Sequence, residues 1–136
     1  MFMRSVTLAA DVGAMRQPGT EFEEATLVYL TQLVYVKPGK EAIFNSFEDA
    51  AIPLIAKHGG ELLLRVRPTK DGILAAGIDV PDEIHLVRFK NEDDFAKFSE
   101  DDERQQALHL KDQSVRAVIL VKGTTELSWN DPGTVR

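Results

Sequence analysis

The sequence contains no cysteine, which excludes disulfide bonds, thiolate metal ligands and a cysteine nucleophile. It also lacks any apolar run near the roughly 18 residues that a membrane-spanning helix requires. The first 15 residues carry one arginine and a short apolar run that Ser5, Thr7 and Asp11 interrupt, a pattern unlike a signal peptide. We therefore expect a cytoplasmic protein without a membrane segment.

Positive charge is scarce, because 16 lysines and arginines face 22 aspartates and glutamates for a net charge of −6. Nucleic-acid binding requires a basic face, so this composition argues against it. The histidines, at positions 58, 85 and 109, lack the close spacing of paired metal ligands. The sequence also has no glycine-rich phosphate loop and no serine or threonine nucleophile motif. We predict neither a resident metal nor another cofactor.

A central unit of residues 26–124 is expected between two arms, residues 1–25 and 125–136. Pro18-Gly19 interrupts the first arm, and the run Asn130-Asp131-Pro132-Gly133 favours a turn in the second. The sequence has no internal repeat. A length of 136 residues suits one domain of this kind.

Four segments rich in β-branched and other apolar residues predict strands, at 26–36, 61–67, 83–89 and 115–123. The loop between the second and third contains several prolines and glycines, and a short hairpin is possible there. With one helical region after the first strand and another after the third, the order is β-α-β-β-α-β. This order is typical of an α+β ferredoxin-like sandwich with a four-stranded antiparallel sheet, in which the first and third strands are central.

The first helical region, residues 40–58, has apolar residues at steps of three and four along one face. Pro53 lies inside it, so we expect a kink or a break there. The second region is expected in two pieces, near 92–98 and 100–113. Asn91 and Ser99 are the predicted N-caps of these two pieces.

Both faces of the sheet are expected to be apolar. In the first strand Leu27, Leu33 and Tyr35 alternate with Val28, Leu30 and Val34. One helical layer covers only one face, and an exposed apolar sheet favours association. We therefore predict a two-fold homodimer whose sheets pack face to face. The alternative is that the arms fold back over the open face.

Three segments of the sequence belong together. They are the run from Pro53 through His58-Gly59-Gly60, the following strand that bears Arg65, and Pro81-Asp82 leading to a strand that ends in Phe89. In these segments the chain resembles a bacterial domain-of-unknown-function family. The resemblance covers about residues 26–124. It implies membership of the dimeric α/β barrel superfamily, in which two sheets form a shared barrel. It further implies a cavity between the sheet and the helices of each subunit, as in the enzymes and haem binders of that superfamily. The segment Phe98–Arg104 departs from the family pattern, because it lacks a proline and a second aromatic residue.

The stretch His58-Gly59-Gly60 is interpreted mainly as a helix stop. Glycine is the usual residue where a helix ends in the left-handed conformation. A histidine in the last turn interacts favourably with the helix dipole. The alternative for Gly60 is close approach of a strand or a ligand.

His85 is the candidate catalytic residue, because it is a polar group in the middle of a central strand. Gln32 is polar in the other central strand. With Tyr29 or Tyr35 and with Arg88, they could line a polar patch in an apolar cavity, which is how small-molecule sites are usually built. The alternative is that His85 and Gln32 bond to neighbours or lie in a dimer interface.

Arg65 and Arg67 lie on one side of the predicted second strand, opposite Leu62, Leu64 and Val66. A structural role explains both arginines, because charged side chains on an edge strand oppose its pairing with another chain. The functional alternative makes Arg65 an anion clamp at the cavity mouth, for a carboxylate ligand.

The leading hypothesis is a homodimeric protein that binds a small apolar or carboxylate molecule. The superfamily resemblance implies cofactor-free oxygenation or isomerisation if the protein is an enzyme, with His85 as general base and Gln32 and Arg88 orienting the substrate. One alternative is a non-catalytic dimeric interaction module. Another is a haem-binding protein.

Overall fold

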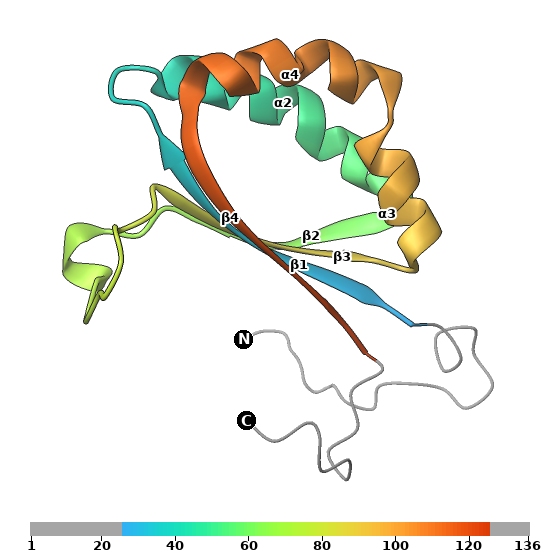
Figure 1. Ribbon diagram of the computed structural model, residues 1–136, viewed down its shortest axis with the longest axis horizontal. Coiled ribbons are helices and arrows are strands. Elements are labelled where there is room, and N and C mark those ends of the chain that lie inside the picture. Colours follow the sequence, from blue (N-terminus) through green and yellow to red (C-terminus); the bar gives the residue numbers. More distant parts are fainter. Residues whose placement is uncertain (1–25, 126–136) are drawn as a thin grey trace, which may run out of the picture.

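The computed structural model describes residues 26–125, which form one sheet with the helices packed on a single side of it (Figure 1). The predicted arms, residues 1–25 and 125–136, lie outside the described residues except for Thr125. In chain order the elements are β1 (Val28–Val36), α2 (Glu41–Lys57), β2 (Gly60–Val66), the 3-10 helix η2 (Lys70–Gly72), β3 (Glu83–Phe89), α3 (Glu92–Ser99), α4 (Asp102–Ser114) and β4 (Val115–Thr124).

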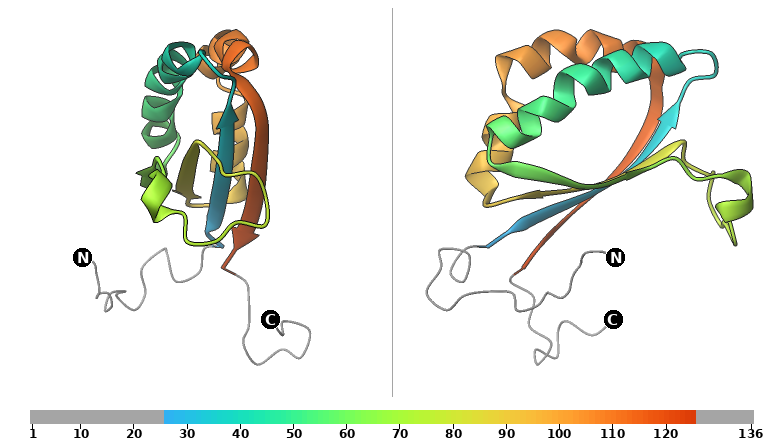
Figure 2. Two further views of the ribbon diagram at one scale, coloured as in Figure 1. Left: turned by 90° about the vertical axis from the view of Figure 1, so that its left-hand side faces the viewer. Right: turned by 180° about the vertical axis from the view of Figure 1, so that it is seen from behind.

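The four strands are antiparallel and lie in the order β2-β3-β1-β4, so β1 and β3 are central as predicted. Helices α2 and α4 lie side by side over one face of the sheet, and the other face carries no helix of the described segment (Figures 1 and 2). This confirms the ferredoxin-like α+β sandwich predicted from the sequence.

The register of the central strands decides which side chains share a face. Gln32 lies directly opposite His85, and Leu120 of β4 lies opposite Gln32 on the other side. Because side chains alternate along a strand, Gln32 and His85 both face the helices. Tyr29 and Arg88, which also form a cross-strand pair, face the open side.

The core lies between the sheet and the helices. The amphipathic stripe of α2 supplies Phe44, Phe47 and Ile55, all of which are buried. Ile55 packs with Val28, Leu30, Val87 and Phe89 of the central strands. Burying a side chain of this size stabilises the fold by about 1.5–3 kcal/mol, so this stripe holds α2 on the sheet.

Helix α2 runs through Pro53 without a break. The side chain of Pro53 is exposed, so the ring lies on the solvent side and the core stripe continues past it. Proline removes one backbone donor, but the packing of the buried stripe on both sides of it keeps the helix in one piece. The expected break is therefore absent.

The second helical region is divided in two, as predicted, and Asn91 caps α3 by accepting a hydrogen bond from the backbone of Asp94 at 2.7 Å. The cap of α4 is not Ser99 but Asp101, whose Oδ1 accepts from the backbone of Glu103 and Arg104. A carboxylate is a stronger acceptor than a hydroxyl and also interacts favourably with the helix dipole.

The loop between β2 and β3 contains η2 and no hairpin, so the short hairpin considered from the sequence is absent. Thr69 Oγ1 accepts a hydrogen bond from the backbone of Gly72, which closes a single turn. The loop projects from one end of the sheet (Figure 1). Among residues 26–125, no helix has the length and apolar character needed to span a membrane.

Helix α2 ends at the predicted stop. Gly59 has a φ of +79°, the left-handed conformation in which a Cβ is unfavourable. At Gly60 a Cβ would lie 2.6 Å from a ring carbon of Phe89, so the absence of a side chain there allows Phe89 to pack. His58 donates from Nε2 to Asp101 Oδ2 at 2.7 Å and ties the end of α2 to the start of α4.

A register shift in β2 lies between Leu62 and Leu64. The extra residue changes the side-chain alternation, so Arg65 lies opposite His85 and faces the helix side, the side that Leu62 also faces. The sequence prediction placed Arg65 and Leu62 on opposite faces, and it was wrong because it assumed an uninterrupted strand.

Candidate functional site

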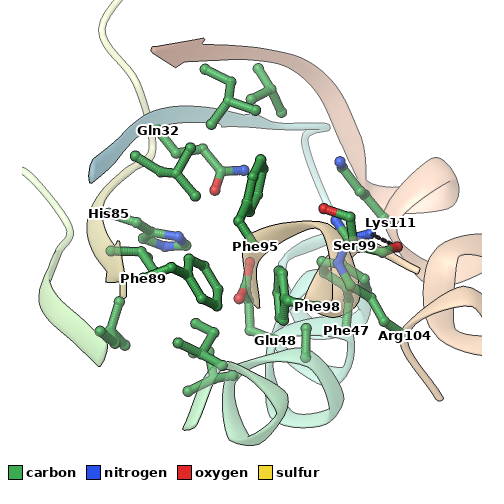
Figure 3. Close-up of a pocket in the computed structure, with 18 residues that line it drawn as sticks. Gln32, Phe47, Glu48, His85, Phe89, Phe95, Phe98, Ser99, Arg104 and Lys111 are labelled. Atoms are coloured by element: carbon green, nitrogen blue, oxygen red, sulfur yellow. Dashed lines mark hydrogen bonds between the residues drawn. The ribbon is translucent and has the colours of Figure 1, made fainter. Parts of the chain in front are cut away.

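A cavity of about 160 Å³ lies between the helices and the inner face of the sheet (Figure 3). Most of its wall is apolar and includes Leu30, Ile55, Val87, Phe89, Phe95 and Phe98. Its polar lining residues come from five different elements, β1, α2, β3, α3 and α4, and they are Gln32, Glu48, His85, Ser99, Arg104 and Lys111. An apolar pocket with a few converging polar groups is the usual form of a small-molecule site.

Aromatic rings form one part of the wall. The ring of Phe89 lies 5.6 Å from that of Phe95 and 5.3 Å from that of Phe98, centroid to centroid. The guanidinium of Arg104 lies 5.1 Å from the centre of the Phe98 ring. Rings at these distances pack against one another and give the cavity an aromatic, apolar wall.

Leu120 of β4 lines the cavity and remains 55% exposed, whereas Val87 on the sheet floor, which also lines it, is 8% exposed. A ligand that entered beside Leu120 would meet the polar groups of the floor, since Gln32 is the cross-strand neighbour of Leu120.

His85 is oriented by a buried carboxylate. Its Nε2 donates to Glu83 Oε1 at 2.8 Å, and Glu83 is 1% exposed. Arg65 donates to both oxygens of Glu83, from Nε at 2.7 Å and from a terminal nitrogen at 3.1 Å, and Arg67 Nε donates at 2.6 Å. Burial opposes ionisation of this carboxyl, but the hydrogen bonds from Arg65, His85 and Arg67 outweigh it and lower the pKa of Glu83 to about 2.

The arrangement leaves one imidazole nitrogen available. Because the ionised Glu83 accepts from Nε2, the neutral form of the ring has its proton on Nε2 and its lone pair on Nδ1. No other residue of the segment 26–125 forms a hydrogen bond with Nδ1. The geometry therefore prepares Nδ1 as a proton acceptor.

Gln32 lies beside His85 on the floor, and its amide extends into the cavity (Figure 3). Within the described chain its amide forms no hydrogen bond with another residue. Its oxygen can accept and its nitrogen can donate, so it can orient a ligand beside the imidazole.

Glu48, on the buried side of α2, is a third polar group, and the sequence prediction missed it. It is 6% exposed and reaches toward the cavity from the helix, opposite the sheet that carries His85 (Figure 3). Burial raises the pKa of Glu48, and the positive charges of Arg65 and Lys111 counter this only in part. A charged residue one turn after Phe44, within an apolar stripe, was the sequence feature that could have identified it.

Three of the sequence candidates lie away from this cavity. Tyr29 and Arg88 contact each other on the open face, where Arg88 also pairs with Glu61. Tyr35 donates from its hydroxyl to the backbone oxygen of Asp79 at 2.8 Å on that face. Strand alternation separates these residues from His85, so the expectation of one shared polar patch is corrected.

Arg65 lies on the helix side of the sheet but its guanidinium is engaged by Glu83. It therefore acts on the site through Glu83 and His85, and it is not part of the cavity lining. Arg104 and Lys111 of α4 are the cationic residues of the lining. Their sequence pattern does not identify them as lining residues, because the polar face of α4 resembles that of any solvated helix. Among residues 26–125 no group of three or more histidines or carboxylates is placed to hold a metal ion.

Solved structures with the same fold are distant in sequence. A protein of unknown function from Rhodopseudomonas palustris has a TM-score of 0.63 at 12% identity, covering 75% of this chain and 86% of its own. A dimeric ferredoxin-like protein of unknown function from Thermobifida fusca YX has a TM-score of 0.54 at 14% identity, covering 74% of this chain and 92% of its own. SnoaB, a cofactor-independent oxygenase from Streptomyces nogalater, has a TM-score of 0.50 at 9% identity, covering 79% of this chain and 99% of its own.

A comparison with curated proteins gave no match. The family model of a domain of unknown function, DUF1330, matches residues 29–124, from the first strand to the last. The match includes every element that lines the cavity. The chain therefore belongs to the DUF1330 family, as the sequence resemblance to a bacterial family of unknown function predicted.

Proposed function

We propose that the protein is a homodimer that binds a small organic molecule in the cavity between sheet and helices, and that His85 acts there as a general base in a cofactor-free reaction. The observation that carries the proposal is the pairing of His85 with Gln32 inside an otherwise apolar cavity. A core histidine with a merely structural role would have both ring nitrogens satisfied by the protein, whereas Nδ1 of His85 has no partner among residues 26–125.

The chemistry follows from the hydrogen-bond chain. Glu83 accepts from Nε2 of His85 and stabilises the imidazolium that forms when Nδ1 takes a proton. Arg65 and Arg67 keep Glu83 ionised, so the carboxylate does not compete for that proton. Gln32 holds the ligand beside the base. Removal of a proton from an activated carbon or hydroxyl is the step that this arrangement supports.

The size of the cavity favours a small ligand. An apolar cavity of about 150 Å³ is large enough for benzene, so a cavity of about 160 Å³ suits a ligand built around one ring. A macrocycle such as haem is several times larger, which disfavours the haem alternative. The reaction class, proton abstraction followed by oxygenation or isomerisation, has a precedent in this fold, since the Streptomyces nogalater structure is a cofactor-independent oxygenase.

The homodimer is supported by the open face of the sheet. Apolar residues there are exposed in a single chain, with Ile119 at 40%, Val121 at 56% and Leu64 at 47%. Burial of such a surface against the same surface of a second copy is favourable. The Thermobifida fusca protein of this fold is described as dimeric. In the proposed assembly, the two sheets form a shared barrel and Tyr29, Tyr35 and Arg88 lie at its interface.

Native mass spectrometry of the gently purified protein tests both parts of the proposal. The expected result is a dimer that retains a discrete small mass, and the His85→Ala variant should remain dimeric but lose that mass. A monomer would refute the assembly. A dimer with no bound mass in either form, which also binds no ring-sized compound at millimolar concentration, would leave a non-catalytic dimeric module as the function.

A further inference from the structure

Glu48 is a buried titratable group that has no role in the proposed reaction. It is 94% buried, since its residual exposure is 6%, and it lines the cavity. Among the described residues its carboxyl forms no hydrogen bond and no ion pair, in contrast to that of Glu83. An unsatisfied buried carboxyl destabilises a fold, so its position indicates that a ligand or a proton satisfies it.

The groups that face Glu48 decide its protonation state. His85, Arg65 and Glu83 act on it from the sheet, and Arg104 and Lys111 act from α4. Arg65 is already bonded to Glu83, so its charge is largely neutralised there. Lys111 lies within the same cavity but makes no ion pair with Glu48. With no bonded cation, desolvation dominates and raises the pKa of Glu48.

We propose that Glu48 is the proton donor of the site, holding its proton in the free protein and donating it to the oxygen of a ring-sized enolisable ketone or phenol that binds opposite His85. This inference rests on the proposed function, because it assigns the substrate class of the same cavity. A neutral carboxylic acid in an apolar site is an effective hydrogen-bond donor to a developing oxyanion.

The charged residues that line the cavity favour a ligand with an acidic oxygen over a ligand with an amine. Arg104 and Lys111 are the cations of the lining, and a protonated Glu48 leaves no anion there to attract an amine. An oxygen that gains negative charge would be attracted by Lys111 and would accept the proton of Glu48. A ring would pack against Phe89, Phe95 and Phe98.

For an enolisable ketone, the conversion to the enol needs only two proton transfers and no cofactor. The C–H bond next to the carbonyl breaks, and Nδ1 of His85 takes the proton. The electron pair forms a carbon–carbon double bond, and the carbonyl electrons move to oxygen. The O–H bond of Glu48 then breaks as its proton passes to that oxygen, which yields the enol, imidazolium His85 and ionised Glu48. Return of the proton to Glu48 through solvent resets the site.

The test uses 4-nitrophenol, a ring-sized phenol whose neutral and ionised forms absorb differently. It is titrated into the full chain and into Glu48→Gln, Glu48→Ala and the control Asp49→Asn, an exposed carboxyl on the same helix. We expect Glu48→Ala to weaken binding roughly tenfold or more, because a hydrogen bond to a charged oxygen is lost. Glu48→Gln should weaken it less, since its amide still donates, and Asp49→Asn should match the wild type.

Benzylamine, a ring-sized cation, serves as the opposite probe and should bind the wild type more weakly than 4-nitrophenol. Tighter binding of 4-nitrophenol to Glu48→Gln than to the wild type, or a preference of the wild type for benzylamine, would show an ionised Glu48 and overturn the inference. Equal binding of 4-nitrophenol by Glu48→Ala and the wild type would also overturn it while leaving the cavity function standing. Failure of the wild type to bind either probe would overturn both.

A second measurement reports the protonation state of the Glu48 carboxyl directly. In protein labelled with carbon-13 at the glutamate carboxyls, the resonance that disappears in Glu48→Gln should titrate above the ordinary glutamate value of 4.5 and shift when 4-nitrophenol is added. Titration below that value would contradict the donor role. This readout requires only the folded protein and no turnover.

Discussion

Glu83 and Glu48 are two buried carboxyl groups whose pKa values shift in opposite directions, one bonded to His85 of the cavity floor and the other lining the cavity from α2. Glu83 accepts hydrogen bonds from Arg65, Arg67 and His85, and its pKa falls to about 2. Glu48 has no hydrogen bond among residues 26–125, and burial raises its pKa. Similar burial therefore accompanies pKa shifts in opposite directions, and the number of bonded donors decides the direction.

The difference arises from the elements that carry the two residues. Glu83 starts β3, where the edge strand β2 brings Arg65 and Arg67 within reach of it. Glu48 lies in the apolar stripe of α2, which faces hydrophobic side chains and the cavity. The proposed base and the proposed proton donor require environments of opposite kinds, and these environments lie in the sheet and in the helix layer.

The largest effect is expected from Glu83→Gln, which removes the charge that pairs with two arginines and a histidine. The free energy of unfolding should fall by on the order of 3 kcal/mol, because breaking a buried ion pair leaves partners unpaired. Urea unfolding of the variant and the wild type measures this. The control is Glu61→Gln, which removes an exposed partner of Arg88 and should change stability by less than about 1 kcal/mol. Equal losses in the two variants would contradict the importance of the Glu83 cluster.

Gly60→Ala changes the shape of the cavity without changing either carboxyl. The added Cβ would lie 2.6 Å from the ring of Phe89 and 2.9 Å from Ile55, so Phe89 must move. We expect a loss of about 2 kcal/mol from overpacking, together with weaker ligand binding. Gly77→Ala is the control, because a Cβ there would have no atom within 4 Å. Thermal unfolding measures the stability of both variants. A Gly60→Ala variant that melts at the wild-type temperature would show that Phe89 can move without a loss of packing.

The smallest effect concerns the dependence of stability on pH. The folded state holds the proton of Glu48 more strongly than the unfolded state, so this residue makes stability fall as the pH rises above 4.5. Glu83 acts in the opposite sense, because its folded pKa is lowered and its contribution is lost as the pH falls from 4.5 towards 2. Glu48→Gln should therefore be more stable than the wild type at pH 7 and lose that advantage near pH 4.

Unfolding curves of Glu48→Gln and the wild type between pH 4 and pH 8 check this prediction. Asp49→Asn, from the exposed side of α2, should follow the wild-type curve throughout. A difference between Glu48→Gln and the wild type that stays constant with pH would show that Glu48 has an ordinary pKa.

The element order and the strand order of the sheet were predictable, because they follow from local patterns. Alternation in the strands and the stripe of α2 determine the layers, and the left-handed Gly59 ends α2 where expected. The cap at Asp101 and the shift between Leu62 and Leu64 were not predictable, since they depend on which partner the folded chain brings near. The single extra residue in β2 is what turns Arg65 toward Glu83.

The candidate site was predictable only in part. His85 and Gln32 could be singled out because polar residues are unusual in central strands, and the structure brings them together. Tyr29, Tyr35 and Arg88 were grouped with them because the register was unknown. Glu48 was missed because hydrophobic periodicity describes the apolar residues of a stripe and ignores the polar residue between them.

The two ends of the described segment are joined to each other. Leu27 donates from its backbone to Thr125 Oγ1 at 2.9 Å, and Thr125 donates from its backbone to Leu27 O at 3.2 Å. β1 and β4 are antiparallel neighbours, and their hydrogen bonds run perpendicular to the strands. A pulling force applied at residues 26 and 125 would therefore act along these bonds and separate one pair at a time, starting at Val28 and Thr124. The molecule should unzip at low force under such a load, whatever its resistance to heat or urea.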